Sequence, residues 1–431
     1  MDLPGGAHVE FSYADHHLSG TVVQVRDGNA TIKLVTGYNV ILPVTELKDL
    51  KTTPKERVEH HAHAPHQDVS LPAVTILHTG GTIASKVDYA TGAVVAQFDP
   101  AELLAMFPDV TKIAHVTSHL LRNMQSDDMR FAHHNLIAKA VLEEITRDAR
   151  GVIVTQGTDT LHYTAAALAF ILEGVNIPVV VVGSQRSSDR GSSDANANLM
   201  GALRFITQAN IPGVFVAMHH GSGDSDIAII EGIRARKNHT SRRDAFSSVN
   251  APIIANVTDG HTEIVNETRV AQLRANASPH PRVLPLDETL KIGIWYAHPQ
   301  SYADELIIYD HYDGVVIAGT GLGHAPITVI DDETSEHERI RTHIARLAKR
   351  IPVVMAPQTI WGRVNMDVYS PGRTLQEMGV LGQGCDTHIE TAFMKLAWLL
   401  SQHKEDTKKL YNTDLRGEVS KRSPLEDSHK G

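Results

Sequence analysis

The sequence predicts a two-lobed α/β core, built from a doubly wound parallel sheet and a smaller C-terminal α/β lobe, preceded by a small N-terminal β-barrel. Three observations lead to this prediction. Residues 1–50 contain short alternating stretches separated by turn signals. From residue 72 onward, β-branched runs alternate with helix-length apolar segments. The chain has 431 residues, enough for two to three domains at roughly 150 residues each.

The N-terminal stretch, residues 1–50, is predicted to form the small barrel. Turn signals at Gly20, at 27–29 and at 36–38 divide it. The predicted strands are 8–11, 21–25, 30–35 and 39–42. Four short strands in so few residues are typical of a docking or binding module, and equally of a structural appendage.

Residues 51–71 are predicted to be a linker, because they combine charge, proline and histidine without apolar periodicity. A metal site formed by its clustered histidines is the functional alternative. It lacks a fixed scaffold or a carboxylate at ligand spacing. These histidines are His60, His61, His63 and His66.

The first lobe is predicted to span residues 72–285. A strand at 151–155, a helix at 160–173 that ends at Gly174, and a strand at 178–182 form a right-handed parallel crossover. Other predicted strands are 74–77, 213–217, 291–295, 314–318 and 352–355. The second lobe is predicted at 286–400. The polar residues 401–431 then form a tail, either frayed or docked through Leu410, Tyr411 and Leu415.

Composition excludes several classes of protein. The 40 Lys and Arg against 50 Asp and Glu give a net charge of −10, which argues against nucleic-acid binding by a broad basic surface. A single cysteine, Cys385, rules out an internal disulfide framework and a multi-thiolate zinc site. The sequence shows no apolar run of membrane-spanning length and no signal-peptide pattern, so a cytoplasmic protein is expected.

Two loops after predicted strands are rich in small hydroxyl residues. The first is His78-Thr79-Gly80-Gly81-Thr82 and the second is Thr155-Gln156-Gly157-Thr158-Asp159-Thr160. Taken alone, the first could be a simple turn and the second a helix capped by its aspartate. In an α/β sheet, however, ligands bind where such loops meet helix N-termini. A threonine nucleophile there needs an activating base, such as a lysine held against a carboxylate.

These loops resemble the two signature motifs of the L-asparaginase family, which read Thr79-Gly80-Gly81-Thr82-Ile83-Ala84 and Gly157-Thr158-Asp159-Thr160 here. The stretch 183–186 with 192–194 resembles the segment after that family's next strand. Other segments resemble the D subunits of archaeal glutamyl-tRNA(Gln) amidotransferases, an asparaginase-related family with an added N-terminal domain. They are 32–40, 362–370 with 372–373, 391–400 and 415–418.

The resemblance implies a glutaminase. Thr82 would attack the side-chain amide carbon of glutamine, forming an acyl-enzyme and releasing ammonia, and water would then free glutamate. Thr158, Asp159 and Lys237 would act as second threonine, orienting acid and base. Tyr89 matches a tyrosine that closes the site, and Ser126 a substrate-holding serine. Asp127, which would bind the α-amino group of the substrate, stands where the family has Gln or Glu.

The resemblance also implies partners. An E subunit would hold tRNA(Gln), ATP and Mg²⁺, activate the misacylated glutamate and receive ammonia through a channel. A homodimer within a heterotetramer is expected, with no cofactor or metal in this chain. The absence of a G-x-x-x-x-G-K-[ST] phosphate loop agrees with this expectation. The alternatives are a free-standing cytoplasmic L-asparaginase with an added domain and a non-catalytic scaffold.

Three other features have simpler interpretations. The run 319–323 has the wrong spacing for a dinucleotide fingerprint and is predicted to be a tight loop. His219 and His220 with Asp224 and Asp226 could suggest a metal site, but the glycines between them indicate a flexible loop. Cys385 lies in no nucleophile motif and is predicted to pack as a small residue.

Overall fold

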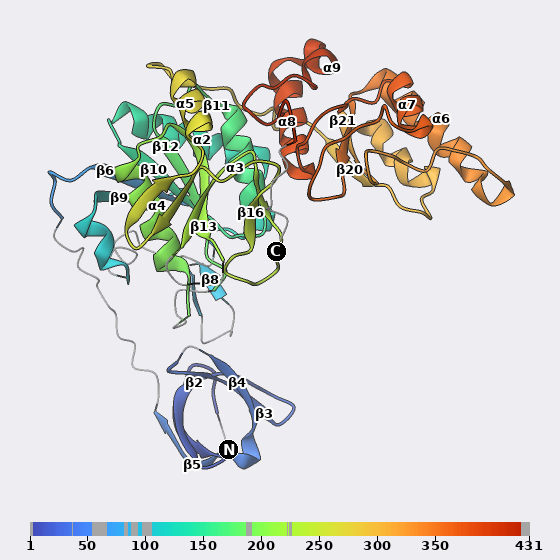
Figure 1. Ribbon diagram of the computed structural model, residues 1–431. Coiled ribbons are helices and arrows are strands. Elements are labelled where there is room, and N and C mark those ends of the chain that lie inside the picture. The colour runs from blue at the N-terminus through green and yellow to red at the C-terminus, as the bar shows by residue number, and fades with distance from the viewer. Residues whose placement is uncertain are drawn as a thin grey trace.

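The computed structural model describes residues 3–36, 38–53, 67–81, 85–87, 94–96, 106–186, 192–221, 223 and 226–423 (Figure 1). Its sheets follow the predicted division into an N-terminal module and two α/β lobes. Among the described residues, no helix is long and apolar enough to cross a membrane.

The N-terminal module is a five-stranded antiparallel sheet curled around its own core, which includes Val9, Phe11 and Ile32 (Figure 1). Its strands are β1 His8–Tyr13, β2 His16–Arg26, β3 Asn29–Leu34, β4 Asn39–Pro43 and β5 Lys48–Thr53, in the order β4-β3-β2-β1-β5. The sequence predicted the first four and missed β5. That strand is polar and mostly exposed, so pairing with β1 rather than an apolar pattern defines it.

The first lobe is built on an eight-stranded sheet in the order β18-β17-β14-β13-β12-β10-β6-β9. Five strands are parallel: β6 Ala73–His78, β9 His115–Leu120, β10 Gly151–Thr155, β12 Pro178–Val182 and β13 Gly213–His219. Every residue of β10, β12 and β13 is buried, as expected for a sheet covered on both faces.

The sheet continues beyond its parallel strands with an antiparallel edge of three strands, which the sequence analysis did not predict. The last three strands, β14 Ile227–Glu231, β17 Ala255–Thr258 and β18 His261–Ile264, are antiparallel to their neighbours. The connection from β13 to β14 is too short for a parallel crossover, which takes a dozen or more residues. Asp259 and Gly260, both with positive φ, form the two-residue turn between β17 and β18.

Helices cover both faces of this sheet (Figure 1). Helices α2 Phe131–Thr146 and α3 Leu161–Ile171 bury apolar side chains in the core of one face, and α4 Ala195–Gln208 in that of the other. Gly174 has φ +65°, but α3 ends at Ile171 with Leu172 as its C-cap, so the predicted helix end at Gly174 is wrong. The last two residues of the predicted helix instead form strand β11 Leu172–Glu173, paired with β19 Arg282–Val283. Helix α5 Glu267–Asn276 lies near the end of this lobe.

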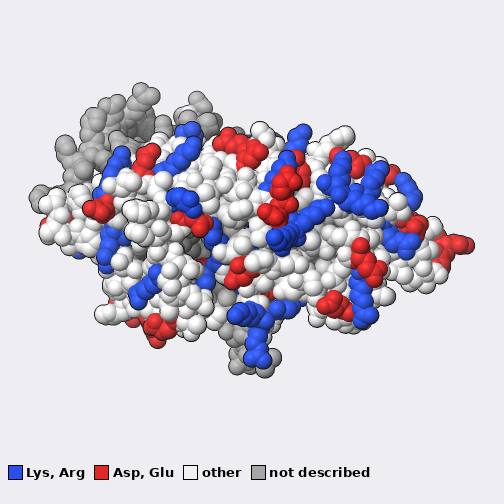
Figure 2. Space-filling model, turned by 90° about the horizontal axis from the view of Figure 1, so that it is seen from above, with Lys and Arg blue, Asp and Glu red and all other residues white. Residues whose placement is uncertain are grey.

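The second lobe contains a three-stranded parallel sheet, β20 Ile292–Tyr296, β21 Gly314–Gly319 and β22 Val353–Pro357. Its helices are α6 Glu336–Arg350, α7 Ser370–Glu377 and α8 Ile389–Gln402. Helix α8 joins the lobes, because its apolar side chains share one core with those of α3 and the strands of both sheets. On the described part of the face in Figure 2, basic and acidic side chains are interspersed.

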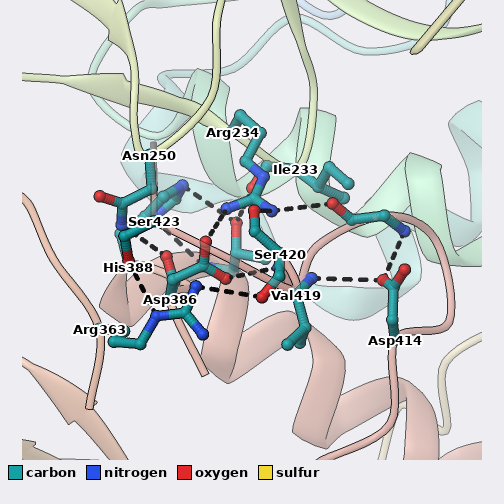
Figure 3. A network of polar contacts seen from close by, with 12 residues as sticks. Ile233, Arg234, Asn250, Arg363, Asp386, His388, Asp414, Val419, Ser420 and Ser423 are labelled. Carbon is teal, nitrogen blue, oxygen red and sulfur yellow. Dashed lines mark hydrogen bonds and ion pairs between the residues drawn. The ribbon is translucent and has the colours of Figure 1, made fainter. Parts of the chain in front are cut away.

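The chain end is folded onto the protein as far as residue 423, which corrects the alternative of a frayed tail. Helix α9 Thr407–Leu410 is followed by Tyr411, which is fully buried. In the network of Figure 3, Arg234 donates to the carboxylate of Asp386 at 3.2 Å and to the hydroxyl of Ser420 at 2.9 Å. The Arg234 and Asp386 side chains are 3% and 0% exposed.

A second buried ion pair fastens the same segment to α8. Lys395 Nζ lies 2.5 Å from the Glu418 carboxylate, and both side chains are almost completely buried. Lys395 also donates to the carbonyl of Thr413 at 2.6 Å. Burial raises the pKa of Glu418, but the charge of Lys395 and its hydrogen bond outweigh burial, so the pKa lies below its usual value.

Replacing Glu418 with alanine should destabilise the protein, because it leaves the Lys395 charge buried without a counter-charge. The expected loss is about 3–5 kcal/mol in the free energy of unfolding, measured by urea denaturation. The control Glu338→Ala removes a half-exposed partner of Arg341 and should cost less than about 1 kcal/mol. Equal losses in the two variants would contradict this account of the tail.

Candidate active site

The two predicted motif loops meet at the edge of the first lobe's sheet where the strand order reverses. The parallel strands run β9-β6-β10-β12-β13, so the chain leaves β6 in one direction and β10 in the other. Such a switch point leaves a crevice beyond the carboxyl ends of the two strands. The segments beginning at Thr79 and at Gln156 follow these two strand ends.

Two glycines let the loops touch. Gly80 and Gly81 have φ of +107° and +87°, a region that favours glycine. A Cβ at Gly81 would lie 2.2 Å from the backbone nitrogen of Gly157. Any side chain here would therefore push the two motif loops apart. The predicted nucleophile Thr82 and the predicted closing residue Tyr89 lie outside the described residues.

Three of the predicted catalytic residues come together. Lys237 ends strand β15 Ala235–Lys237, which pairs with β16 Phe246–Ser248. Its Nζ donates to Thr158 Oγ1 at 2.9 Å and to Asp159 Oδ1 at 2.7 Å. The Lys237 side chain is 9% exposed, whereas that of Asp159 is 64% exposed. An almost buried ammonium thus links a threonine hydroxyl to a solvent-facing carboxylate.

Of the three residues predicted to bind the substrate, Ser126 lies against these loops, Asp127 does not, and Tyr89 lies outside the described residues. Ser126 is buried, and a Cβ at Gly157 would lie 3.1 Å from its hydroxyl oxygen. The carbonyl of Ser126 accepts a 2.6 Å hydrogen bond from Thr160, the residue after Asp159. Asp127, the next residue, is exposed. The structure therefore brings Ser126 to the motif loops and leaves Asp127 facing solvent.

The loop after β12 borders the same site and is held by a buried aspartate. A Cβ at Gly183 would lie 2.7 Å from the methyl group of Thr158. The carboxylate of Asp194 accepts hydrogen bonds from the Ser184 hydroxyl at 2.8 Å and from the backbone nitrogens of Gln185 and Arg186 at 3.0 Å. These bonds fix the loop beside the second threonine.

Several residues at the site have no counterpart in the sequence predictions. His78, the last residue of β6, is buried between the hydroxyls of Thr155 at 2.7 Å and Ser118 at 2.8 Å. Burial, with a smaller contribution from His119, lowers the pKa of His78 to about 4, so its imidazole is neutral at pH 7. Gln156 has a buried Oε1 without a hydrogen-bond partner in the described structure.

The structure bears on two of the remaining motifs, the run 319–323 and Cys385. Residues after β21 form a tight turn in which Thr320 bridges to His324. Within the described ranges, no three His, Cys, Asp or Glu side chains gather as a metal site. The linker histidines and Asp224 lie outside those ranges. Cys385 is buried, and burial raises the pKa of its thiol to about 11, which disfavours a thiolate nucleophile.

Comparison with known proteins matches both lobes to one family. Residues 73–270 match the family described as "Asparaginase, N-terminal", and residues 291–412 match "Glutaminase/Asparaginase C-terminal domain". The D subunit of the glutamyl-tRNA(Gln) amidotransferase of Methanococcus maripaludis is 35% identical over 434 residues, covering 99% of this chain and 100% of the relative. The chain belongs to this family of amidotransferase D subunits. The corresponding D subunit of Thermococcus kodakarensis is 38% identical, covering 90% of this chain and 87% of the relative.

Solved structures show the same core in relatives that match less of this chain. The thermostable L-asparaginase of Thermococcus kodakarensis is 28% identical with a TM-score of 0.71, and the match covers 81% of this chain and 99% of that one. L-asparaginase I of Vibrio cholerae has a TM-score of 0.68 at the same identity and coverage. The amidotransferase relatives thus extend over parts of the chain that these asparaginases lack. The family and fold inferred from the sequence motifs are confirmed.

The buried histidines should make stability depend on pH. Burial is also the main cause that lowers the pKa of His134 in α2 to about 4. For both His78 and His134, the unfolded state binds a proton between pH 6.5 and 4 that the folded state does not. Stability is therefore fully present above pH 6.5 and falls as the pH drops toward 4, by roughly 3 kcal/mol per histidine.

His134→Gln should reduce the fall in the free energy of unfolding between pH 7 and pH 4.5 by roughly 2 kcal/mol, which is the share of this one histidine. The variant can change stability at pH 7 through its lost contact with Thr164, so the quantity compared is the difference between the two pH values. A difference equal to that of the unsubstituted chain would contradict the assignment of His134 as a buried neutral imidazole.

Proposed function

We propose that this chain is the glutaminase subunit of a glutamyl-tRNA(Gln) amidotransferase. It hydrolyses glutamine and supplies ammonia to a partner that converts misacylated Glu-tRNA(Gln) to Gln-tRNA(Gln). The observation that supports the chemistry best is the position of Lys237 Nζ between Thr158 and Asp159, beside the loop that leads to residue 82. The observation that supports the amidotransferase role is the similarity to amidotransferase D subunits along 99% of the chain.

The proposed reaction proceeds through an acyl-enzyme. The Thr82 hydroxyl attacks the amide carbon of glutamine and loses its proton, the carbon–nitrogen bond breaks, and ammonia leaves after taking up a proton. Water then attacks the ester, releasing glutamate and restoring the hydroxyl. Thr158 and Lys237 carry the proton, and Asp159 orients Lys237. In the described arrangement Lys237 donates to Thr158, so acting as a base requires this hydrogen bond to reverse.

Substrate contacts are assigned to the rim of the crevice. Ser126 holds glutamine next to the motif loops, and solvent-facing Asp127 receives its α-amino group. Tyr89 closes the site. The low exposure of Lys237 supports this arrangement, because excluding water strengthens the interactions of its charge with a developing oxyanion and with Asp159.

The proposed partner is the amidotransferase E subunit, which holds the tRNA, ATP and Mg²⁺, with this chain as a homodimer in a heterotetramer. The net charge of −10 suits a chain that leaves most RNA binding to its partner. A free-standing L-asparaginase is the second candidate, since solved L-asparaginases match 81% of the chain.

Ammonia release from glutamine and from asparagine, with and without the E subunit and glutamylated tRNA, separates the two candidates. Release from glutamine that rises when both are added supports the amidotransferase. Strong release from asparagine that is indifferent to both additions would leave an asparaginase.

Thr82→Ala should lower glutamine hydrolysis by roughly 10³-fold or more, because the nucleophile is lost. Lys237→Met should lower it by about 10²–10⁴-fold through loss of proton transfer. Both are measured as kcat from ammonia release, with Lys112→Met, which removes an exposed partner of Asp109, as the control that keeps full activity. Retained hydrolysis in Thr82→Ala would exclude Thr82 as the nucleophile.

Removing residues 1–53, which contain the five strands of the N-terminal module, should impair transfer of ammonia to tRNA more than hydrolysis of glutamine. The module has a core of its own, so the two lobes keep theirs. The two rates are measured in the complex. An insoluble product would instead assign a structural role to the module.

A further inference from the structure

A buried carboxylate of the second lobe lies behind the proposed catalytic residues. Glu390, in the first turn of α8, is 8% exposed. Its carboxylate accepts hydrogen bonds from His388 Nδ1 at 2.8 Å and Arg236 Nε at 3.2 Å, and it lies 3.6 Å from His162 Nε2. Three nitrogen-bearing side chains from three different segments therefore converge on one carboxylate.

Two of these side chains sit next to the proposed catalytic residues in the sequence. Arg236 directly precedes Lys237 in β15, and because side chains alternate along a strand it points away from the site. His162 lies in the first turn of α3, the helix that follows Thr158 and Asp159. Glu390 thus contacts both chain segments whose relative position sets the Lys237 hydrogen bonds.

We propose that Glu390 is a positioning residue, which holds β15 and the start of α3 at the spacing that keeps Lys237 Nζ within reach of Thr158 and Asp159. This inference rests on the proposed function, since it assigns Glu390 to the support of that reaction. Because Glu390 belongs to the second lobe, that lobe helps to position Lys237, Thr158 and Asp159, which all belong to the first lobe.

Neighbouring contacts fix the same strand from other directions. The hydroxyl of Thr391, next to Glu390, donates to the carbonyl of Ile233 at 2.9 Å, shortly before β15. Arg236 also donates to Asn238 Oδ1 at 3.2 Å, and Asn238 donates to the Ser247 hydroxyl at 2.5 Å. These hydrogen bonds fix the backbone on both sides of Lys237. Glu390 differs from the other residues in this group because it also contacts His162 in α3.

The charge of Glu390 is maintained despite burial. Burial raises the pKa of this carboxyl, but the 3.6 Å contact with His162 and the hydrogen bond from His388 outweigh burial, and the pKa lies well below its usual range. The carboxylate is therefore ionised at neutral pH and accepts from the surrounding donors. A neutral amide at this position would present an N–H₂ group toward at least one of those donors.

The test is the steady-state hydrolysis of glutamine by Glu390→Gln and Glu390→Ala. A displacement of about 1 Å at a reacting group can cost up to roughly 10²-fold in rate, so we expect kcat to fall about 10-fold in Glu390→Gln and about 100-fold in Glu390→Ala. The KM for glutamine should stay within about twofold, because Glu390 is buried and its described side-chain contacts are with Arg236, His162 and His388.

The matched control is Glu418→Gln, which replaces a buried carboxylate that also forms an ion pair at α8, in this case with Lys395. Its thermal midpoint should fall as that of Glu390→Gln does, while its kcat stays within about twofold of the unsubstituted chain. Equal kcat values in the two variants, or a raised KM at full kcat in Glu390→Gln, would overturn the positioning role. If Glu390→Gln does not fold, Arg236→Met replaces it, because this variant removes the Arg236–Glu390 ion pair at its partly exposed member. We expect Arg236→Met to lower kcat in the same way. Full kcat in that variant would overturn the positioning role.

Two further readouts separate this inference from the proposed function. An unsubstituted chain that fails to hydrolyse glutamine in its complex overturns the proposed function. An active unsubstituted chain with full kcat in Glu390→Gln overturns the positioning role alone. Independently of turnover, a crystal structure of Glu390→Gln should show Lys237 Nζ displaced from Thr158 and Asp159, and unchanged distances would refute the inference.

Discussion

The packing of helix α8 against helix α3 is the contact on which the arrangement of this protein depends. The two helices belong to different lobes, yet their apolar side chains form one continuous core with strands of both sheets. Aromatic rings mark the contact, with Phe170 and Trp398 centred 5.9 Å apart and Tyr163 and Phe393 6.0 Å apart. Ring contacts of this kind bury large areas and tolerate little displacement. The lobes therefore behave as one packed unit at the position where the motif loops lie.

This packing also explains why polar groups can be buried at the junction. The carboxylate of Glu390 and the ammonium of Lys395 both belong to α8, and each meets partners from segments distant in sequence. A buried charge is costly unless its partners are held in good geometry. A well-packed apolar contact between the helices provides that geometry. Apolar packing and polar links therefore depend on each other at this junction.

Much of the fold could be predicted because its signals are local. The buried strands of the first lobe are short β-branched runs, which the sequence shows directly. Strand β5 could not be predicted, because its polar residues carry no apolar alternation and pairing with β1 defines it. The direction of the last three strands depends on how long the connections between them are. A sequence pattern that identifies strands one by one carries no information about those connections.

The same distinction applies to the candidate site. Thr158, Asp159 and Lys237 could be named because the motifs that carry them are continuous in the sequence, and the structure brings the three together. Glu390 could not, because an isolated acidic residue near the start of a helix is most simply a helix cap. Its importance lies in contacts with segments far away in the chain, which no local pattern records.

The folded chain end has a consequence for how the protein is made. Arg234 and Arg269 belong to the first lobe, yet they donate hydrogen bonds to backbone carbonyls at Gly417 and Arg416. Protein synthesis proceeds from the N-terminus, and domains generally fold in that order. The first lobe, although translated early, cannot form its full set of hydrogen bonds until residues 416 and 417 have left the ribosome. Its structure is therefore completed only after the whole second lobe has been synthesised.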